Sequence, residues 1–159
     1  MGRFIGALAL ALITACSTAK KDTLSEAQAA PTPERTMVTL GNGEANSITP
    51  QGVTRDGATF TFATATVADD SWLVIHPFKD GRPNGDIYVG HTFLAAGTHQ
   101  NIPITVEGGA QTGQMFLVML HKDVDQDRVF DFVFIDENTV EDHAVFEGTK
   151  MIAHIFAAP

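Results

Sequence analysis

Short apolar segments separated by turn-forming residues make up the chain from residue 37 onward. In the clearest of them Ile102, Ile104 and Val106 share one side of an extended segment, and the residues between them share the other. This period of two is typical of a β-strand with one buried face. We therefore predict a set of strands and no helix longer than one or two turns. The strands are expected at residues 37–40, 58–67, 72–78, 87–94, 101–107, 114–121, 129–135 and 145–156, the last with a break at Gly148.

Aromatic residues recur within these predicted strands. Phe130, Phe132 and Phe134 alternate with Val129, Asp131, Val133 and Ile135, which predicts a strand with an aromatic face. Trp72, Phe78, Phe93 and the three phenylalanines could line a ligand pocket. Aromatic residues on one face of a sheet more often bury their area against a facing sheet, so we assign most of them to the core.

The strand pattern predicts an all-β fold with one domain over residues 37–159. About 120 residues can bury a sufficient core without disulfides. The many short strands with regular turn signals favour an immunoglobulin-like β-sandwich. A cupredoxin-like Greek-key barrel is the alternative, because the two folds differ in connectivity, which periodicity does not reveal.

The N-terminus has the charged, apolar and small-residue order of an export signal, so residues 1–15 are interpreted as a signal peptide. The apolar run is too short for a transmembrane helix. Ile13-Thr14-Ala15-Cys16 resembles the lipobox of bacterial lipoproteins, which implies lipidation of Cys16, the only cysteine. Residues 16–36 would then be the lipidated cysteine and a flexible linker. Ordinary cleavage after Ala19, giving a soluble secreted protein, is the alternative.

This resemblance implies a chain exported and lipid-anchored to the outer membrane or the cell surface. Removal of residues 1–15 would take away one basic residue, Arg3, and leave nine Lys and Arg against 19 Asp and Glu, a net charge of −10. Such a charge repels phosphate backbones, so we expect no nucleic-acid partner. The expected partners are the membrane, through the anchor, and an unknown protein or glycan.

The sequence offers little support for an enzyme. None of its four serines lies in a G-x-S-x-G elbow, and its one cysteine is assigned to the lipid. His121 and Asp123 form an H-x-D pair that could serve acid/base chemistry. Because no third catalytic group is identifiable, we favour a structural hydrogen-bonded pair.

An acidic segment carries the first candidate metal site. Asp123, Asp125, Asp127 and Asp131 occupy positions 1, 3, 5 and 9 of a loop of the calcium-binding EF-hand type. Position 6 is Arg128 where that loop needs glycine, and position 12 is Phe134 where it needs glutamate, unless Asp136 or Glu137 folds back. Calcium is therefore a possible cofactor, and an acidic turn exposed to water is the alternative.

A second candidate metal site uses softer ligands. Met115, Met119 and His121 lie two or four residues apart, so they share one face of a predicted strand and could bind copper or zinc. The chain has no H-x-H pair and no H-x₃₋₅-H pair, and packed side chains are the commoner use of such residues.

Three passages resemble a family of domains of unknown function found in haloarchaeal cell-surface proteins and some secreted bacterial proteins. They are residues 73–76 (LVIH), 93–102 (FLAAGTHQNI) and 117–123 (LVMLHKD) running on to 129–132 (VFDF). The resemblance implies an extracytoplasmic β domain without a known activity.

The sequence thus favours a non-enzymatic, lipid-anchored envelope domain that serves binding, adhesion or assembly. A metal-binding protein is the alternative, either a calcium-stabilised module or a copper-handling relative of the cupredoxins.

Overall fold

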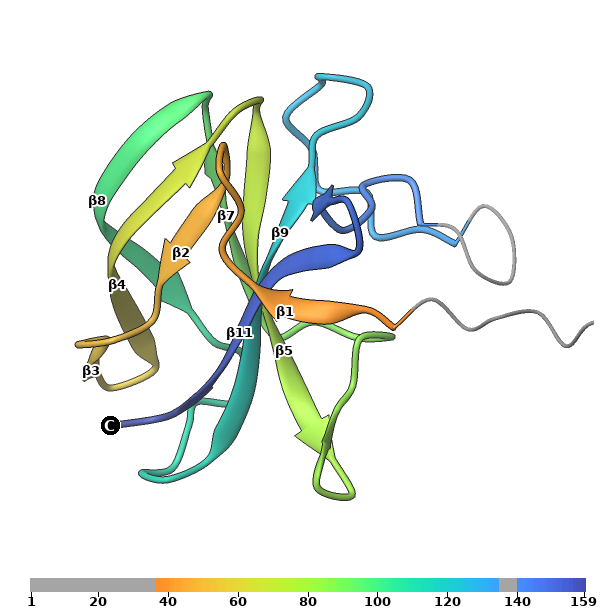
Figure 1. Ribbon diagram of the computed structural model, residues 1–159. Helices are drawn as coiled ribbons and strands as arrows, with labels where there is room; N and C mark the ends of the chain where they lie inside the picture. The colour runs from red at the N-terminus through yellow and green to blue at the C-terminus, as the bar shows by residue number, and fades with distance from the viewer. Residues whose placement is uncertain (1–36, 135–139) are drawn as a thin grey trace, which may run out of the picture. The chain divides into compact units, whose positions relative to one another are not determined.

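The computed structural model describes residues 37–134 and 140–159 (Figure 1). This part of the chain is all-β, with eleven strands and no helix. The strands are β1 (Thr39–Gly41), β2 (Ser47–Thr49), β3 (Thr54–Asp56), β4 (Thr59–Val67), β5 (Ser71–Lys79), β6 (Arg82–Pro83), β7 (Gly90–Leu94), β8 (Gly97–Thr105), β9 (Met115–Lys122), β10 (Phe146–Glu147) and β11 (Lys150–Ala157).

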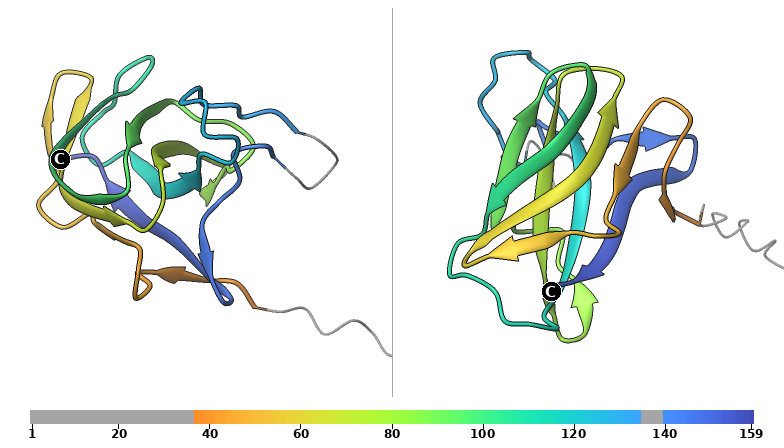
Figure 2. Two further views of the ribbon diagram at one scale, coloured as in Figure 1. Left: turned by 90° about the horizontal axis from the view of Figure 1, so that it is seen from above. Right: turned by 90° about the vertical axis from the view of Figure 1, so that its left-hand side faces the viewer.

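The strands form two sheets. In the larger one, β9 lies between β5 and β11, and both pairings are antiparallel. The far edge of β5 pairs with β7 and β6, while β11 pairs with β10 and, in parallel, with β1. In the smaller sheet, β4 pairs with β8 along one edge and with β2 and β3 along the other. Seen from above, the strands surround a common interior (Figure 2).

Large apolar side chains from both sheets fill that interior. Phe60 of β4 contacts Phe116 of β9 and Phe156 of β11 edge to face, with ring centroids 5.6 and 5.5 Å apart. Leu73 and Ile75 of β5 join the same cluster and are fully buried. This packing of one sheet on the other confirms the predicted all-β sandwich.

Most of the long predicted strands are present. The face assignment in β8 is confirmed, because Ile102, Ile104 and Val106 are buried whereas Asn101, Pro103 and Thr105 are exposed. The strand predicted at residues 129–135 is wrong over its described part, where Phe134 makes only an isolated bridge to Val140. The sequence also did not predict β2, β3 and β6, which are only two or three residues long.

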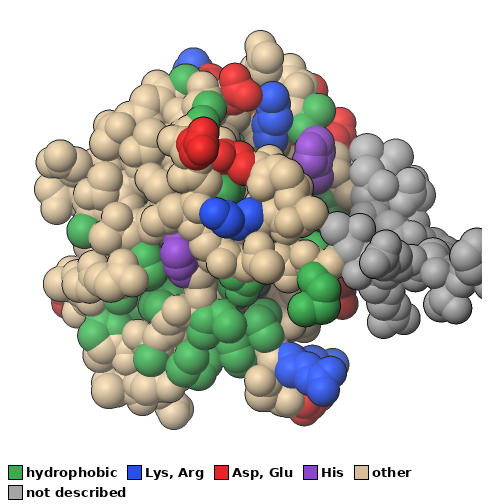
Figure 3. All heavy atoms as spheres, viewed as in Figure 1, with side chains coloured by type: hydrophobic (Ala, Val, Ile, Leu, Met, Phe, Trp, Pro, Cys, Tyr) green, Lys and Arg blue, Asp and Glu red, His purple; other side chains and the backbone are tan. Residues whose placement is uncertain are grey.

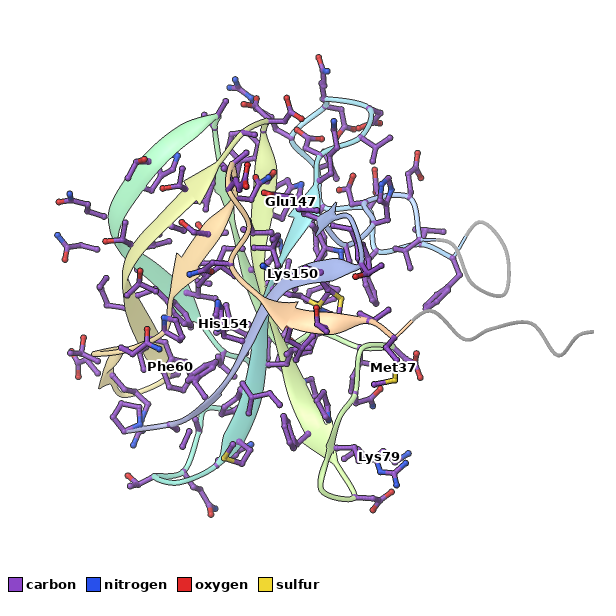
Figure 4. All side chains as sticks on the ribbon, viewed as in Figure 1. Met37, Phe60, Lys79, Glu147, Lys150 and His154 are labelled. Atoms are coloured by element: carbon purple, nitrogen blue, oxygen red, sulfur yellow. The ribbon has the colours of Figure 1, made fainter. Side chains whose placement is uncertain are left out.

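The carboxylate of Glu147 binds the loop between β1 and β2. The Glu147 carboxylate accepts hydrogen bonds from the side-chain amide of Asn46 and from the backbone N–H groups of Glu44, Ala45 and Asn46. The bond from the Asn46 side chain, followed by the backbone bonds, holds the pKa of Glu147 below its usual value. In Figure 4, Glu147, Lys150 and His154 follow one another along β10 and β11 beside this loop. The loop is thereby fixed to the edge of the larger sheet.

Acidic and apolar side chains concentrate on different parts of one face of the surface. On the face drawn in Figure 3, most acidic side chains lie in the upper half, basic ones are spread over both halves, and hydrophobic ones gather over the lower half. Among the residues that the structure describes, no helix has the length and hydropathy to span a membrane.

The assignment of faces in β8 generates a test. Ile104 is 1% exposed, so Ile104→Asp should destabilise the domain by on the order of 3 kcal/mol by burying an unpaired carboxylate. Thr105→Asp, one residue further on the exposed face, removes only a bond to the Thr59 hydroxyl and should cost less than about 1 kcal/mol. Thermal unfolding of both variants decides it, and equal melting temperatures would contradict the assignment.

Candidate functional site

The outer face of the larger sheet is apolar, like its inner face. On β5, Trp72, Val74 and His76 alternate with the core residues Leu73 and Ile75, and all of them are buried. On β9, Leu117, Met119 and His121 likewise point away from the interior and are buried. The two central strands therefore have two buried faces, and only one of them faces the smaller sheet.

Aromatic side chains from irregular segments cover this outer face. Phe130 lies 5.5 Å from Trp72, 5.4 Å from His121 and 4.9 Å from His91, measured between ring centroids. Phe132 contacts His121, and both phenylalanines contact Tyr88 of the segment between β6 and β7. The expectation that these aromatics pack between the two sheets is wrong.

Two of the three remaining aromatic residues also pack on the outer face of the larger sheet. Phe93 packs against Trp72 at 5.2 Å, and Phe78 packs against the small cluster around Met119 on the same outer face. Phe134 is 47% exposed and borders a hollow at the edge of the cover. Val129 and Val133, which alternate with the phenylalanines, are exposed, whereas Phe130 and Phe132 are half-buried, so the predicted alternation of faces is present only in part.

Two histidines meet beneath the aromatic cover. The Nε2 atoms of His76 and His121 are 3.2 Å apart, and the two side chains are 0% and 3% exposed. Each Nδ1 atom lies 2.6 Å from a backbone carbonyl oxygen, that of Ile87 for His76 and that of Asp142 for His121. Burial lowers the pKa of His76 and lowers that of His121 to about 3.

Three carboxylates converge where the chain leaves β9. One oxygen from each of Asp123, Asp125 and Asp142 lies within 4.8 Å of the others. Asp123 is 1% exposed, and neither of its oxygens has a hydrogen-bond partner among the described residues. A buried carboxylate without a partner is costly, because it has lost its water and gained nothing in return.

Asp142 is buried as well, but both of its oxygens are fixed by backbone groups. Oδ1 accepts from the N–H of Val124, and Oδ2 accepts from the N–H of Asp131, each at 3.1 Å. The pKa of Asp142 is raised above its usual value, because burial and the charges of Asp123 and Asp125 together outweigh the two hydrogen bonds, which lower it. Asp142 thus ties both ends of the 124–131 segment together at the position where negative charge accumulates.

The backbone of that segment has one feature of a calcium loop. Gln126 and Arg128 have positive φ angles of 62° and 61°, so Arg128 adopts the left-handed conformation that glycine usually supplies at position 6. Asp125, Asp127 and Asp131 also bring one oxygen each within 4.8 Å of one another. Asp125 belongs to both groups, which lie side by side.

The structure places the four predicted acidic residues in two groups that share Asp125, and it adds Asp142 to the group that contains Asp123. The sequence did not predict Asp142 as part of a site, because its separation of 19 residues from Asp123 matches no loop pattern. Asp136 and Glu137 lie outside the described residues, as does Cys16.

The softer ligand set is only partly brought together. Met119 and His121 share the outer face of β9, as predicted, but Met115 is exposed at the opposite end of the strand, about 20 Å from His121. The partner of His121 is His76, which no spacing rule would select because it lies 45 residues away. His121 binds the carbonyl of Asp142, and no hydrogen bond joins it to Asp123, so the structural pair that we expected is wrong.

The two sites suit different ions. The clustered carboxylates supply only oxygen atoms, which are the ligands that a hard cation such as Ca²⁺ prefers. Two imidazole nitrogens among aromatic rings and a thioether suit a softer ion.

Comparison with known proteins finds a family for the fold but no characterised relative. No curated protein and no solved structure matches the chain. The model of one protein family matches residues 46–156, which span β2 to β11 and include both groups of side chains. The chain belongs to this family, the domain of unknown function DUF7282.

Proposed function

We propose that this chain is an exported, lipid-anchored envelope protein whose β-sandwich is a non-enzymatic binding module stabilised by calcium. The observation that carries the proposal is Asp123, a buried carboxylate without a partner that faces Asp125 and Asp142. A cation bound between the three would give Asp123 the partner that the described residues do not supply.

Electrostatics favours a cation at this position. Two unit charges 5 Å apart repel by about 3 kcal/mol at an effective dielectric constant of about 20, and here three carboxylates lie within that separation. Protonation would relieve only part of the repulsion and would still leave the buried Asp123 oxygens without partners. Calcium relieves both costs, since it binds six to eight oxygens in flexible geometry.

The backbone is arranged to hold the acidic group before an ion binds. The two hydrogen bonds to Asp142 fix that carboxylate, and the Asp125 and Asp127 side chains accept from the N–H groups two residues ahead. Asp142 supplies one more carboxylate from outside the loop, in place of the glutamate that an EF-hand loop has at position 12. Calcium loops of extracellular modules bind with Kd values of about 0.1–1 mM, which suits an exported protein.

Calcium here would act on the binding surface as well as on stability. The Asp142 carboxylate binds the N–H of Asp131 at the end of the 124–131 segment. The same segment carries Phe130, which is part of the cover over Trp72 and His121. An ion at the base of this segment would hold the cover in place. We expect the loops around it to contact a protein or glycan partner, because binding surfaces are commonly carried by loops on a rigid β scaffold.

The calcium site predicts a specific pattern of stabilities. Calcium at a hundredfold excess over Kd should stabilise the chelator-treated protein by about 2.7 kcal/mol, or raise its melting temperature by roughly 10 °C, with saturation. Asp123→Asn should abolish this shift and leave the calcium-free protein as stable as before or more stable, because it removes a buried unpaired charge. Exposed Asp56 on β3 is the matched control, and Asp56→Asn should keep the shift.

The opposite pattern would exclude the site. If calcium has no effect on the unaltered protein, or if Asp123→Asn lowers the melting temperature and keeps the calcium shift, Asp123 has only a structural role.

The raised pKa of Asp142 predicts a dependence on pH. A group whose pKa is raised by folding stabilises the fold when protonated, and that contribution is lost as the pH rises through its folded pKa. Calcium binds the carboxylate form, so the calcium-induced shift in melting temperature should be largest near pH 7 and should shrink between pH 6 and pH 4. Comparing melts with and without calcium at each pH cancels groups outside the site, such as Glu147. A shift of equal size at pH 4 and pH 7 would contradict this.

The anchor is tested in the cells that produce the protein. Cys16→Ser should abolish labelling by a fatty-acid probe and release the domain from the membrane fraction, because the thiol of Cys16 is the expected site of acylation. Ser17→Ala, which keeps the cysteine, should stay labelled. If the unaltered chain takes up no lipid and is recovered in soluble form beginning near Lys20, it is a secreted protein.

A further inference from the structure

Two neutral imidazoles do not carry enough protons for all the polar contacts of His76 and His121. A backbone carbonyl can only accept, so each Nδ1 atom, at 2.6 Å from its carbonyl, must carry a proton. A neutral imidazole has one proton, which leaves both Nε2 atoms bare. Two lone pairs therefore face each other across 3.2 Å.

The orientation of the rings directs the two lone pairs at each other. The ring centroids are 5.4 Å apart and the ring planes are inclined by 26°. With the Nε2 atoms 3.2 Å apart, this separation is reached only when both atoms lie near the line that joins the ring centres. The lone pairs thus point at each other, and the arrangement needs a positive charge between them.

A proton fits this position poorly. Both imidazoles are buried, with 0% and 3% of their surface exposed, so a positive charge on either ring would have lost its water. The rings of Phe130 and Phe132 pack against the pair, and among the described residues no carboxylate is hydrogen-bonded to either imidazole. The desolvated site disfavours an imidazolium.

The same features are those of a metal-bound pair of histidines. A ligating imidazole usually donates its second ring N–H to a carbonyl or carboxylate, which fixes the tautomer and the ring orientation, as both Nδ1 atoms do here. An open hollow of about 350 Å³, bordered by Met119, His121 and His143, reaches His121 from the surface. An ion can therefore reach His121 without unfolding of the sheet.

The ligand set selects among metals. No third His, Cys, Asp or Glu converges on the pair within the described part of the chain, so the four ligands of a zinc site are not present there. Cu(I) accepts two ligands in line and a soft third one. Imidazole and thioether both suit it, and Met119 shares the outer face of β9 with His121. With metal–nitrogen bonds of about 2 Å, the Nε2 atoms would need to part by less than 1 Å.

We propose that His76 and His121 bind one Cu(I) ion through their Nε2 atoms, with Met119 as the neighbouring soft ligand. This site is separate from the acidic group. It uses nitrogen and sulfur in an apolar pocket where the acidic group uses oxygen, and neither proposal depends on the other.

Competition with a chromogenic Cu(I) chelator, bicinchoninate, under anaerobic reducing conditions tests the site. All chains carry Cys16→Ser, so that no thiol competes. The parent should bind one Cu(I) per chain, and His76→Asn and His121→Asn should each weaken binding at least tenfold. The asparagine amide keeps a donor for the carbonyl beside Nδ1 but has no Nε2 atom, which favours folding of the variants. His99 of β8, whose Nε2 bonds the carbonyl of Ala95, is the control, and His99→Asn should bind as the parent does.

Nitrogen NMR of the parent chain gives a second readout that needs no substitution at the pair. Without copper, the Nε2 atoms of His76 and His121 should both have the chemical shift of unprotonated nitrogen, and one equivalent of Cu(I) should move both. No bound Cu(I), or equal binding by the parent and His76→Asn, would overturn the proposal. An Nε2 signal that shows a bound proton and does not respond to Cu(I) would identify the pair as sharing a proton.

Discussion

The two apolar faces of the β5–β9 pair are the constraint on which the rest of the structure depends. One face packs against the smaller sheet, as in any β-sandwich. The other carries Trp72, His76, Met119 and His121, and it would lie open to water without a cover. At about 25 cal/mol per Å² of apolar area, exposing several such side chains would cost a large part of the stability of a small domain. Phe130 and Phe132, which follow β9, provide the cover together with Tyr88.

This cover lacks the regular backbone pairing of a sheet, so polar groups hold it. The Nδ1 of His121 binds the carbonyl of Asp142, while the carboxylate of Asp142 binds the N–H groups of Val124 and Asp131. Both candidate ion sites lie at these attachment points. The acidic group is at the start of the covering segment, and the histidine pair is beneath its phenylalanines. The same residues that close the outer face thus have the chemistry to bind cations.

Sequence periodicity predicted the strands and faces that depend on local burial, and it failed where structure depends on partners distant in sequence. The alternation in β8 correctly predicted that Ile102 and Ile104 are buried. The alternation of Phe130 and Phe132 marks two half-buried side chains, but no strand pairs with that segment, so the strand prediction failed. The loop pattern identified Asp123 and Asp125, whereas Asp142 and His76 enter their sites through the fold, 19 and 45 residues away from their partners.

A crystal structure of the mature chain grown with millimolar calcium would test the central claim, that a cation at the base of the covering segment holds it over the outer face. The account predicts an ion bonded to oxygens of Asp123, Asp125 and Asp142 at about 2.3–2.6 Å, with Phe130 and Phe132 packed over His121 as they are here. An Asp123 carboxylate that contacts only water in such crystals, beneath the same well-ordered aromatic cover, would contradict it.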